Sequence, residues 1–209
     1  MRRRLAALLA GAAGLVVTGA VADTPATGGE LRALADFDTI GDPRARSAAM
    51  FVEAGKVLQH PRCLNCHPVS RQPTQGEDLH AHQPPIHGGS HDHGVAGLPC
   101  DTCHGAANVP TLGHPIRSVP GSSHWGLAPV SMAWQGQSLA EICNQIKDPA
   151  RNGGRSLAQI GEHMGRDPLV GWAWQPGEGR VPAPGTQQQF ASLIEAWIAT
   201  GGHCPEESP

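Results

Sequence analysis

The sequence predicts a mainly α-helical, loop-rich fold for this chain of 209 residues. Three stretches in its C-terminal third open with capping-box pairs and carry apolar residues at helical spacing. Elsewhere 27 Gly and 19 Pro interrupt the chain, and no strand pattern competes convincingly. With no Tyr and only three Phe, the chain lacks many of the large side chains that fill a core. Another group is therefore expected to fill part of it.

The N-terminus has the pattern of an export signal. Arg2–Arg4 precede an apolar stretch, Leu5–Val17, and a small-residue site, Ala20–Ala22. We expect cleavage after Ala22, a mature chain without a stable membrane span, and a periplasmic location. The alternative is a retained anchor, because the 18 uncharged residues from Leu5 to Ala22 lie at the lower limit of a span.

Charge argues against one class of partner. Removal of residues 1–22 leaves 12 basic and 18 acidic residues, a formal charge of −6. A chain this acidic is not expected to bind nucleic acid.

The rest of the chain divides into a flexible lead-in, residues 23–42, and one domain, residues 43–209. The lead-in carries Pro, Gly and Thr without a sustained period. Pro43 after Asp42 is typical of a first helical position, and His60-Pro61 is expected to end that helix.

Three later helices are expected to begin after Ser138, Ser156 and Thr186, each followed three residues on by Glu or Gln. Gly201-Gly202 marks the end of the last one. Their apolar stripes are Leu139, Ile142, Cys143 and Ile146; Leu157, Ile160 and Met164; and Phe190, Leu193, Ile194, Trp197 and Ile198.

Two copies of C-x-x-C-H carry the chemistry. This is the attachment pattern of c-type haem: two thiols add to the porphyrin vinyl groups, and the adjacent His supplies the proximal nitrogen to iron. The first motif is Cys63, Cys66 and His67, and the second is Cys100, Cys103 and His104. We expect two covalent haems, with the helices packed around them in place of the missing aromatic core.

Two C-x-x-C pairs can also form a four-thiolate zinc site, disulfides or thioredoxin-like redox sites. The His after both pairs and the export signal favour haem, since free thiolates tend to oxidise outside the cytoplasm. The remaining two cysteines, Cys143 and Cys204, are expected to form a disulfide, with two free buried thiols as the alternative.

The second axial ligand of each iron is less determined. Between the motifs lies a loop region, Pro68–Pro99, with five His, and its length suggests that it drapes over a cofactor. We favour His93 for the first iron and consider His163, Met132 and His82 for the second. His163 could equally be a surface residue at the edge of its helix's apolar stripe, and Met132 a core residue. The loop could instead bind copper, nickel or zinc.

Several segments resemble bacterial proteins labelled "isoquinoline 1-oxidoreductase subunit". They are His60–Pro68, Met132–Gly136, Cys143 with Lys147–Arg155, and Val170–Trp172. The oxidoreductase chemistry implied by that label belongs to a large molybdenum hydroxylase, and this chain has no identifiable molybdopterin site. The resemblance therefore implies a haem partner of such an enzyme.

Together these features predict a periplasmic dihaem c-type cytochrome that carries electrons from a dehydrogenase or molybdenum hydroxylase towards a cytochrome or oxidase of the respiratory chain. No catalytic residue is expected. The alternatives are a dihaem enzyme with an open iron, such as a peroxidase or a sulfur- or nitrogen-compound oxidoreductase, and a His-rich metal-binding protein.

Overall fold

The computed structural model describes residues 29–111 and 118–207, and the expected export signal lies outside them. The described chain is mainly helical and loop-rich, as the sequence predicts. Its α-helices are α1 (Pro43–Leu58), α2 (Pro61–Leu64), α3 (Leu139–Lys147), α4 (Leu157–Arg166), α5 (Pro168–Gly171) and α6 (Gln187–Ala199). Its 3-10 helices are η1 (Leu34–Phe37), η2 (Cys100–Thr102), η3 (Val130–Met132) and η4 (Trp172–Trp174).

The strands are short and form three two-stranded antiparallel sheets. They are β1 (Thr74–Gln75) with β2 (His80–Ala81), β3 (Gly94–Val95) with β4 (Leu98–Pro99), and β5 (Ala107–Pro110) with β6 (Ser118–Ser122). Strands of two to five residues are too short for a visible alternation of apolar and polar residues, so the sequence pattern does not predict them.

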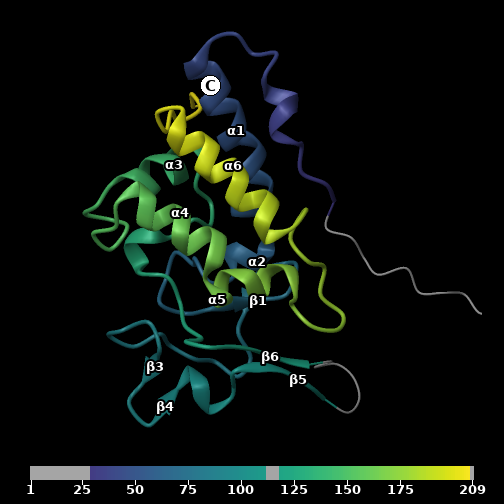
Figure 1. Cartoon of the computed structure of the whole chain (residues 1–209). Helices are drawn as coiled ribbons and strands as arrows, with labels where there is room; N and C mark the ends of the chain where they lie inside the picture. The colour runs from purple at the N-terminus through teal and green to yellow at the C-terminus, as the bar shows by residue number, and fades with distance from the viewer. Residues whose placement is uncertain (1–28, 112–117, 208–209) are drawn as a thin grey trace, which may run out of the picture.

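The molecule has two parts (Figure 1). The helical body consists of α1, α3, α4 and α6, and the hairpin lobe consists of residues 88–111 and 118–125 with β3 to β6. The short helices α2 and α5 lie at the boundary between the parts (Figure 1). The first C-x-x-C-H motif begins in α2 and the second in η2 of the hairpin lobe.

The core of the helical body forms where α6 packs between α1 and α4. Phe51 of α1 meets Trp197 of α6 with ring centroids 4.8 Å apart. Ile142 and Ile146 of α3, with Ile194 of α6, are fully buried in the same cluster. The apolar stripes that predict the helices therefore pack largely against one another.

The helix starts follow from local chemistry. Asp42 accepts a hydrogen bond from the Ala45 amide, and Ser138 and Ser156 form complete capping boxes. Thr186 accepts from the amide of Gln189 at 3.1 Å and so caps α6 through this one bond. The helices therefore begin where the sequence predicts. Each capping bond joins residues within four positions of each other, so the local sequence is sufficient to predict these starts.

The structure corrects the prediction of a flexible lead-in. Residues 29–42 are not a flexible segment: they contain η1, and Phe37 is buried in the main core with Leu31. The Arg32 amide donates to the Glu53 carboxylate of α1 at 3.0 Å. Leu31, Leu34, Phe37 and Ile40 recur at every third position, but this periodic signal is short, and only the packing shows that Leu31 and Phe37 are buried.

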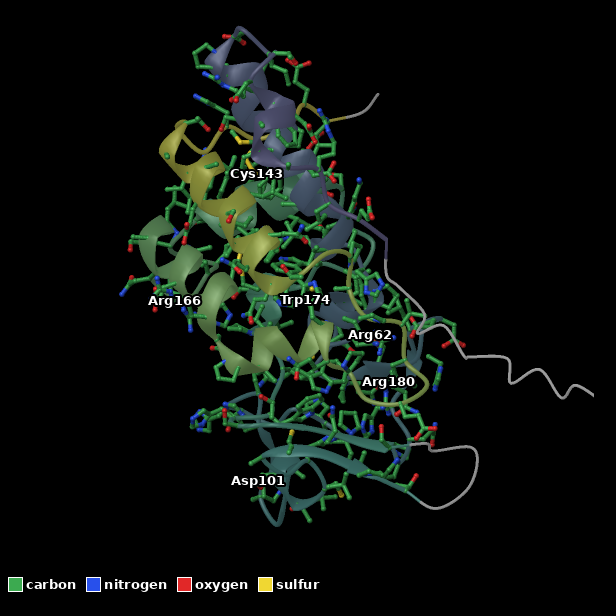
Figure 2. All side chains as sticks on the ribbon, turned by 45° about the vertical axis from the view of Figure 1, so that its right-hand side comes forward. Arg62, Asp101, Cys143, Arg166, Trp174 and Arg180 are labelled. Carbon is green, nitrogen blue, oxygen red and sulfur yellow. A yellow bond between two sulfur atoms is a disulfide. The ribbon has the colours of Figure 1, made fainter. Side chains whose placement is uncertain are left out.

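A disulfide and hydrogen bonds link the segment after α6 to the helical body. The expected Cys143–Cys204 disulfide is present and joins α3 to the segment after α6, in the region marked by Cys143 in Figure 2. Nearby, Ser47 of α1 donates to the Trp197 carbonyl and accepts from the His203 amide. None of the helices within residues 29–111 and 118–207 has the length and apolar character needed to cross a membrane.

Candidate functional site: two cysteine and histidine motifs with their cavities

The first motif opens on a cavity of about 200 Å³ between the helical body and the loop 126–135. We call it the first-motif cavity. Cys63, Cys66 and His67 line one side, together with residues of α1, α4, α5, η4 and α6. Ile160 and Met164, two members of the predicted apolar stripe of α4, also line it. The stripe thus faces a cavity as well as neighbouring helices.

Backbone hydrogen bonds hold the first motif against this loop. The Ala128 amide donates to the Cys66 carbonyl at 2.9 Å, and the Trp134 amide donates to the His67 carbonyl at 2.9 Å. Gln135 donates to the Leu64 carbonyl and to the Thr74 hydroxyl. The position of His67 is therefore fixed by a segment more than sixty residues away in the sequence.

The His67 imidazole is oriented as in a metal ligand. Its Nδ1–H donates to the Met132 carbonyl at 2.7 Å, which leaves Nε2 with a free lone pair. The Trp134 ring stacks on the imidazole, with centroids 3.5 Å apart and planes 8° from parallel. Burial lowers the pKa of His67 to about 4, so the ring is neutral at physiological pH.

The second motif repeats this arrangement in the hairpin lobe. The Nδ1–H of His104 donates to the Pro120 carbonyl of β6 at 2.7 Å, and Trp125 stacks on the ring at 4.6 Å and 10°. Burial also lowers the pKa of His104. The surroundings of the two motifs share no sequence pattern, so the same imidazole geometry arises from unrelated segments.

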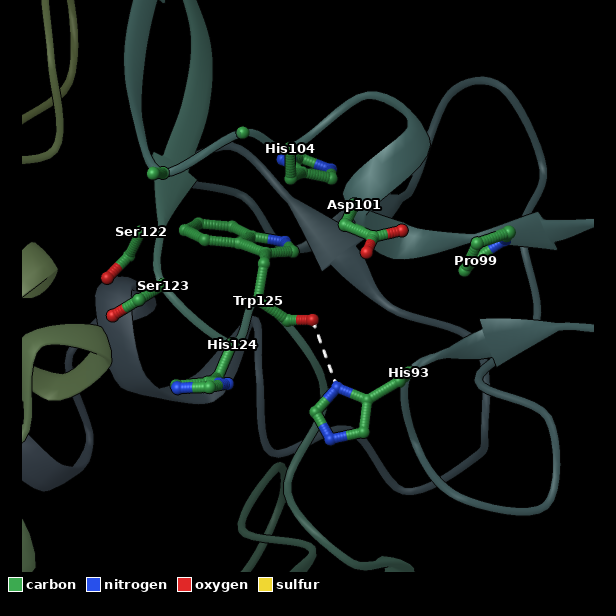
Figure 3. A pocket seen from close by; sticks show the side chains of 10 residues that line it. His93, Pro99, Asp101, His104, Ser122, Ser123, His124 and Trp125 are labelled. Atoms are coloured by element: carbon green, nitrogen blue, oxygen red, sulfur yellow. Dashed lines mark hydrogen bonds between the residues drawn. The ribbon is translucent and has the colours of Figure 1, made fainter.

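The second-motif cavity has a volume of about 410 Å³ and is lined by His93, Pro99, Asp101, His104, Gly105, Ala106, Ser122, Ser123, His124 and Trp125. Figure 3 shows His104 and His93 on either side of the Trp125 indole, with His93 bonded to the Trp125 carbonyl. Three imidazoles and one carboxylate line this cavity. Cys103 is exposed, whereas Cys63 and Cys66 are partly covered.

The four motif cysteines are free thiols, in contrast to the Cys143–Cys204 pair. Burial and the neighbouring Cys66 raise the pKa of Cys63 to about 12, and burial raises that of Cys66 to about 11. Both are thus protonated thiols at neutral pH. Among the described residues, no three His, Cys, Asp or Glu side chains form a group that could hold a metal ion.

The structure places three of the four candidate distal ligands beside the other motif from the one we assigned, whereas His82 lies beside the motif for which we considered it. His163 and Met132, considered for the second iron, line the first-motif cavity. His93, favoured for the first iron, lines the second-motif cavity, and His82 lies 5.9 Å from His104 between ring centroids. Spacing along the chain did not show these distances because the loops fold back at the Gly-rich turns.

The two first-cavity candidates differ in position. The Met132 carbonyl accepts the His67 Nδ1–H, so the Met132 backbone lies on the Nδ1 side of this imidazole. His163 donates its Nδ1–H to the Asp167 carboxylate at 2.9 Å, which leaves its own Nε2 free. A carboxylate that fixes the outer nitrogen of a His is a common device of metal ligands.

The fit of a haem to the first-motif cavity can be tested on its polar atoms. Buried N–H groups of Arg62 and Trp134, both lining the cavity, have no hydrogen-bond partner. Such groups cost about 1–3 kcal/mol each unless something binds them. A porphyrin carries two anionic propionates that accept such bonds. With the paired thiols and free Nε2 atoms, the residues present fit a covalent haem.

Sequence reasoning missed Arg62, Trp125, Trp134 and Asp167 as site residues. Arg62 directly precedes Cys63, but its burial, at 3% exposure, was not visible in the sequence. Asp167 stands four residues after His163, a spacing that places the two side chains on one face of a helix. That spacing was the one available signal. Nothing in the sequence pairs the two Trp residues with the motif histidines.

A scan against protein-family models and searches of curated proteins and of solved structures returned no match.

Proposed function

We propose that this protein is an exported dihaem c-type cytochrome whose function is electron transfer. The observation that carries the proposal is the repeated imidazole geometry: His67 and His104 each donate Nδ1–H to a backbone carbonyl, stack on a Trp and keep Nε2 free. The same geometry beside two separate thiol pairs suits two haem irons.

In this proposal each residue has a defined role. Cys63 and Cys66 would hold one haem covalently, Cys100 and Cys103 the other, and the bound irons would supply reversible one-electron chemistry. His67 and His104 would be the proximal ligands. We assign His163 as the distal ligand of the first haem, because it lines that cavity with its free Nε2. His93 and His82 are the candidates at the second.

The partners follow from the same proposal. An exported electron carrier would accept electrons from a periplasmic dehydrogenase and pass them to a cytochrome or oxidase. The resemblance of several segments to a molybdenum-hydroxylase-associated family favours a donor of that class.

The test is a haem count on protein matured in the periplasm, by pyridine haemochrome. We expect two c-type haems per chain, one in a Cys63→Ala/Cys66→Ala variant and one in the matched Cys100→Ala/Cys103→Ala variant. A wild-type chain without covalent haem would refute the proposal. Stoichiometric zinc would then support the four-thiolate alternative.

A dihaem enzyme with an open iron is the second candidate, favoured by the three imidazoles and the carboxylate that line the cavity of the second motif. Carbon monoxide distinguishes it from a carrier, because a six-coordinate iron resists the gas. An unchanged Soret band in the reduced protein supports electron transfer alone. A shift at one haem, lost in the Cys100→Ala/Cys103→Ala variant, supports catalysis at the second.

A further inference from the structure

Two tryptophans from distant segments meet between the cavities. The rings of Trp125 and Trp172 contact each other edge to face, with centroids 5.0 Å apart and planes at 90°. This is a favourable geometry for an aromatic pair. Trp125 belongs to the loop after β6 and Trp172 to η4, so the contact joins two segments 47 residues apart.

Each ring belongs to a different site. Trp125 lines the second-motif cavity and stacks on His104. Trp172 lines the first-motif cavity and is 8% exposed. The three rings of His104, Trp125 and Trp172 therefore form an unbroken series from the second imidazole to the wall of the first cavity.

The Trp172 ring is held in place by Asn108 of β5. The Trp172 Nε1–H donates to the Asn108 Oδ1 at 2.9 Å, and the same oxygen accepts from the Gly121 amide. The Asn108 amide nitrogen donates to the Gln175 carbonyl, just after η4. Asn108 thus fastens η4 to the β5–β6 sheet at the place where the two rings touch.

We propose that the Trp125–Trp172 contact couples the two haem sites electronically. The inference rests on the proposed function. With both haems bound, one would be oxidised as the other is reduced, and the transfer would make or break no bond and move no proton. Trp125 also stacks on His104 and Trp172 also lines the first-motif cavity, so the pair contacts both sites.

The experiment measures the rate at which an electron equilibrates between the two sites. The oxidised protein is reduced by one electron with a photogenerated flavin semiquinone, and freeze-quench electron paramagnetic resonance follows the two ferric signals. We expect a several-fold slower equilibration in Trp172→Leu and a smaller decrease in Trp172→Phe, which keeps a ring. Asn108→Ala, which frees the Trp172 ring, should slow it as well.

Trp174→Leu is the matched control, because Trp174 lies in the same 3-10 helix but packs on Phe190 instead of Trp125. The midpoint potentials of each variant show whether the driving force is unchanged. An unaltered rate in Trp172→Leu and Asn108→Ala, at unaltered potentials and with two haems present, would overturn the coupling role. A wild-type protein with fewer than two haems would instead refute the proposed function.

Discussion

At the scale of a residue, one hydrogen bond sets the orientation of each motif imidazole. Burial lowers the pKa of both His67 and His104, and each ring donates its Nδ1–H to a backbone carbonyl. The C-x-x-C-H pattern predicts which His binds iron. It does not predict which carbonyl fixes the ring, since Met132 and Pro120 come from elsewhere in the chain.

The Asp167 carboxylate should tune the first haem alone. A carboxylate acceptor makes the His163 imidazole more electron-rich and so stabilises ferric iron. We expect Asp167→Asn to raise the midpoint potential of the first haem and to leave the second unchanged, as measured by spectroelectrochemical titration. Glu162→Gln is the control, because it removes a carboxylate of the same helix that pairs with Arg166. An equal shift in both variants would point to a general charge effect.

Asn152 is the clearest structural residue near the first cavity. It is buried, its amide nitrogen donates to the carbonyls of Ile146 and Arg155, and its oxygen accepts from the Arg155 amide. Asn152→Ala would leave these buried groups unpaired, and we expect a loss of about 2 kcal/mol in the free energy of unfolding. Urea titration measures it. Ser192→Ala, on the exposed side of α6, should change stability little.

At the scale of elements, local signals predict the helices and long-range contacts place them. Asp42, Ser138 and Ser156 cap their helices as their positions indicate. The packing of α6 between α1 and α4 depends on which apolar faces are complementary. No single apolar stripe in the sequence specifies this packing.

The disulfide should stabilise the helical body chiefly by restricting the unfolded chain. Cys143 and Cys204 are 61 residues apart, and closing a loop of that length contributes about 4 kcal/mol. We expect the Cys143→Ala/Cys204→Ala variant to lose that amount in urea titration. Wild-type protein treated with a reductant should behave in the same way. A loss in the variant without a loss on reduction would indicate packing by the sulfur atoms instead.

At the scale of the whole molecule, the free energy of unfolding of the haem-free chain should depend on pH. The pKa of His67 falls from the usual 6.5 to about 4 on folding, so between these values the unfolded state binds more protons. The contribution of His67 to the free energy of unfolding should therefore be fully present above pH 6.5 and should fall by about 3 kcal/mol as the pH approaches 4. Urea titrations of haem-free protein across this range measure it.

Two comparisons make this test specific. His67→Gln in the haem-free chain should flatten the pH dependence. With haem attached, a His67 that stays on the iron in the unfolded chain binds no proton in either state, so its contribution to the pH dependence should disappear. A His67→Gln variant with the slope of the wild type would assign the effect to other groups.

The sequence by itself determined the helix starts, the partner cysteines of the disulfide and the two thiol–imidazole motifs. These depend on residues within one or two turns of each other, or, for the disulfide, on an even number of leftover cysteines. The order of the lead-in could not be predicted in this way, because the short series Leu31, Leu34, Phe37 and Ile40 does not show what it packs against.

Only the tertiary structure decided which residues meet across the chain. It brought His163 with Asp167 to the first motif, His93 to the second, and Trp125 against Trp172. The segments concerned are joined by Gly- and Pro-rich loops, in which spacing along the chain does not determine distance in space. Their positions are set by the packing of the helical body and by backbone hydrogen bonds of the hairpin lobe, which are properties of the folded chain as a whole.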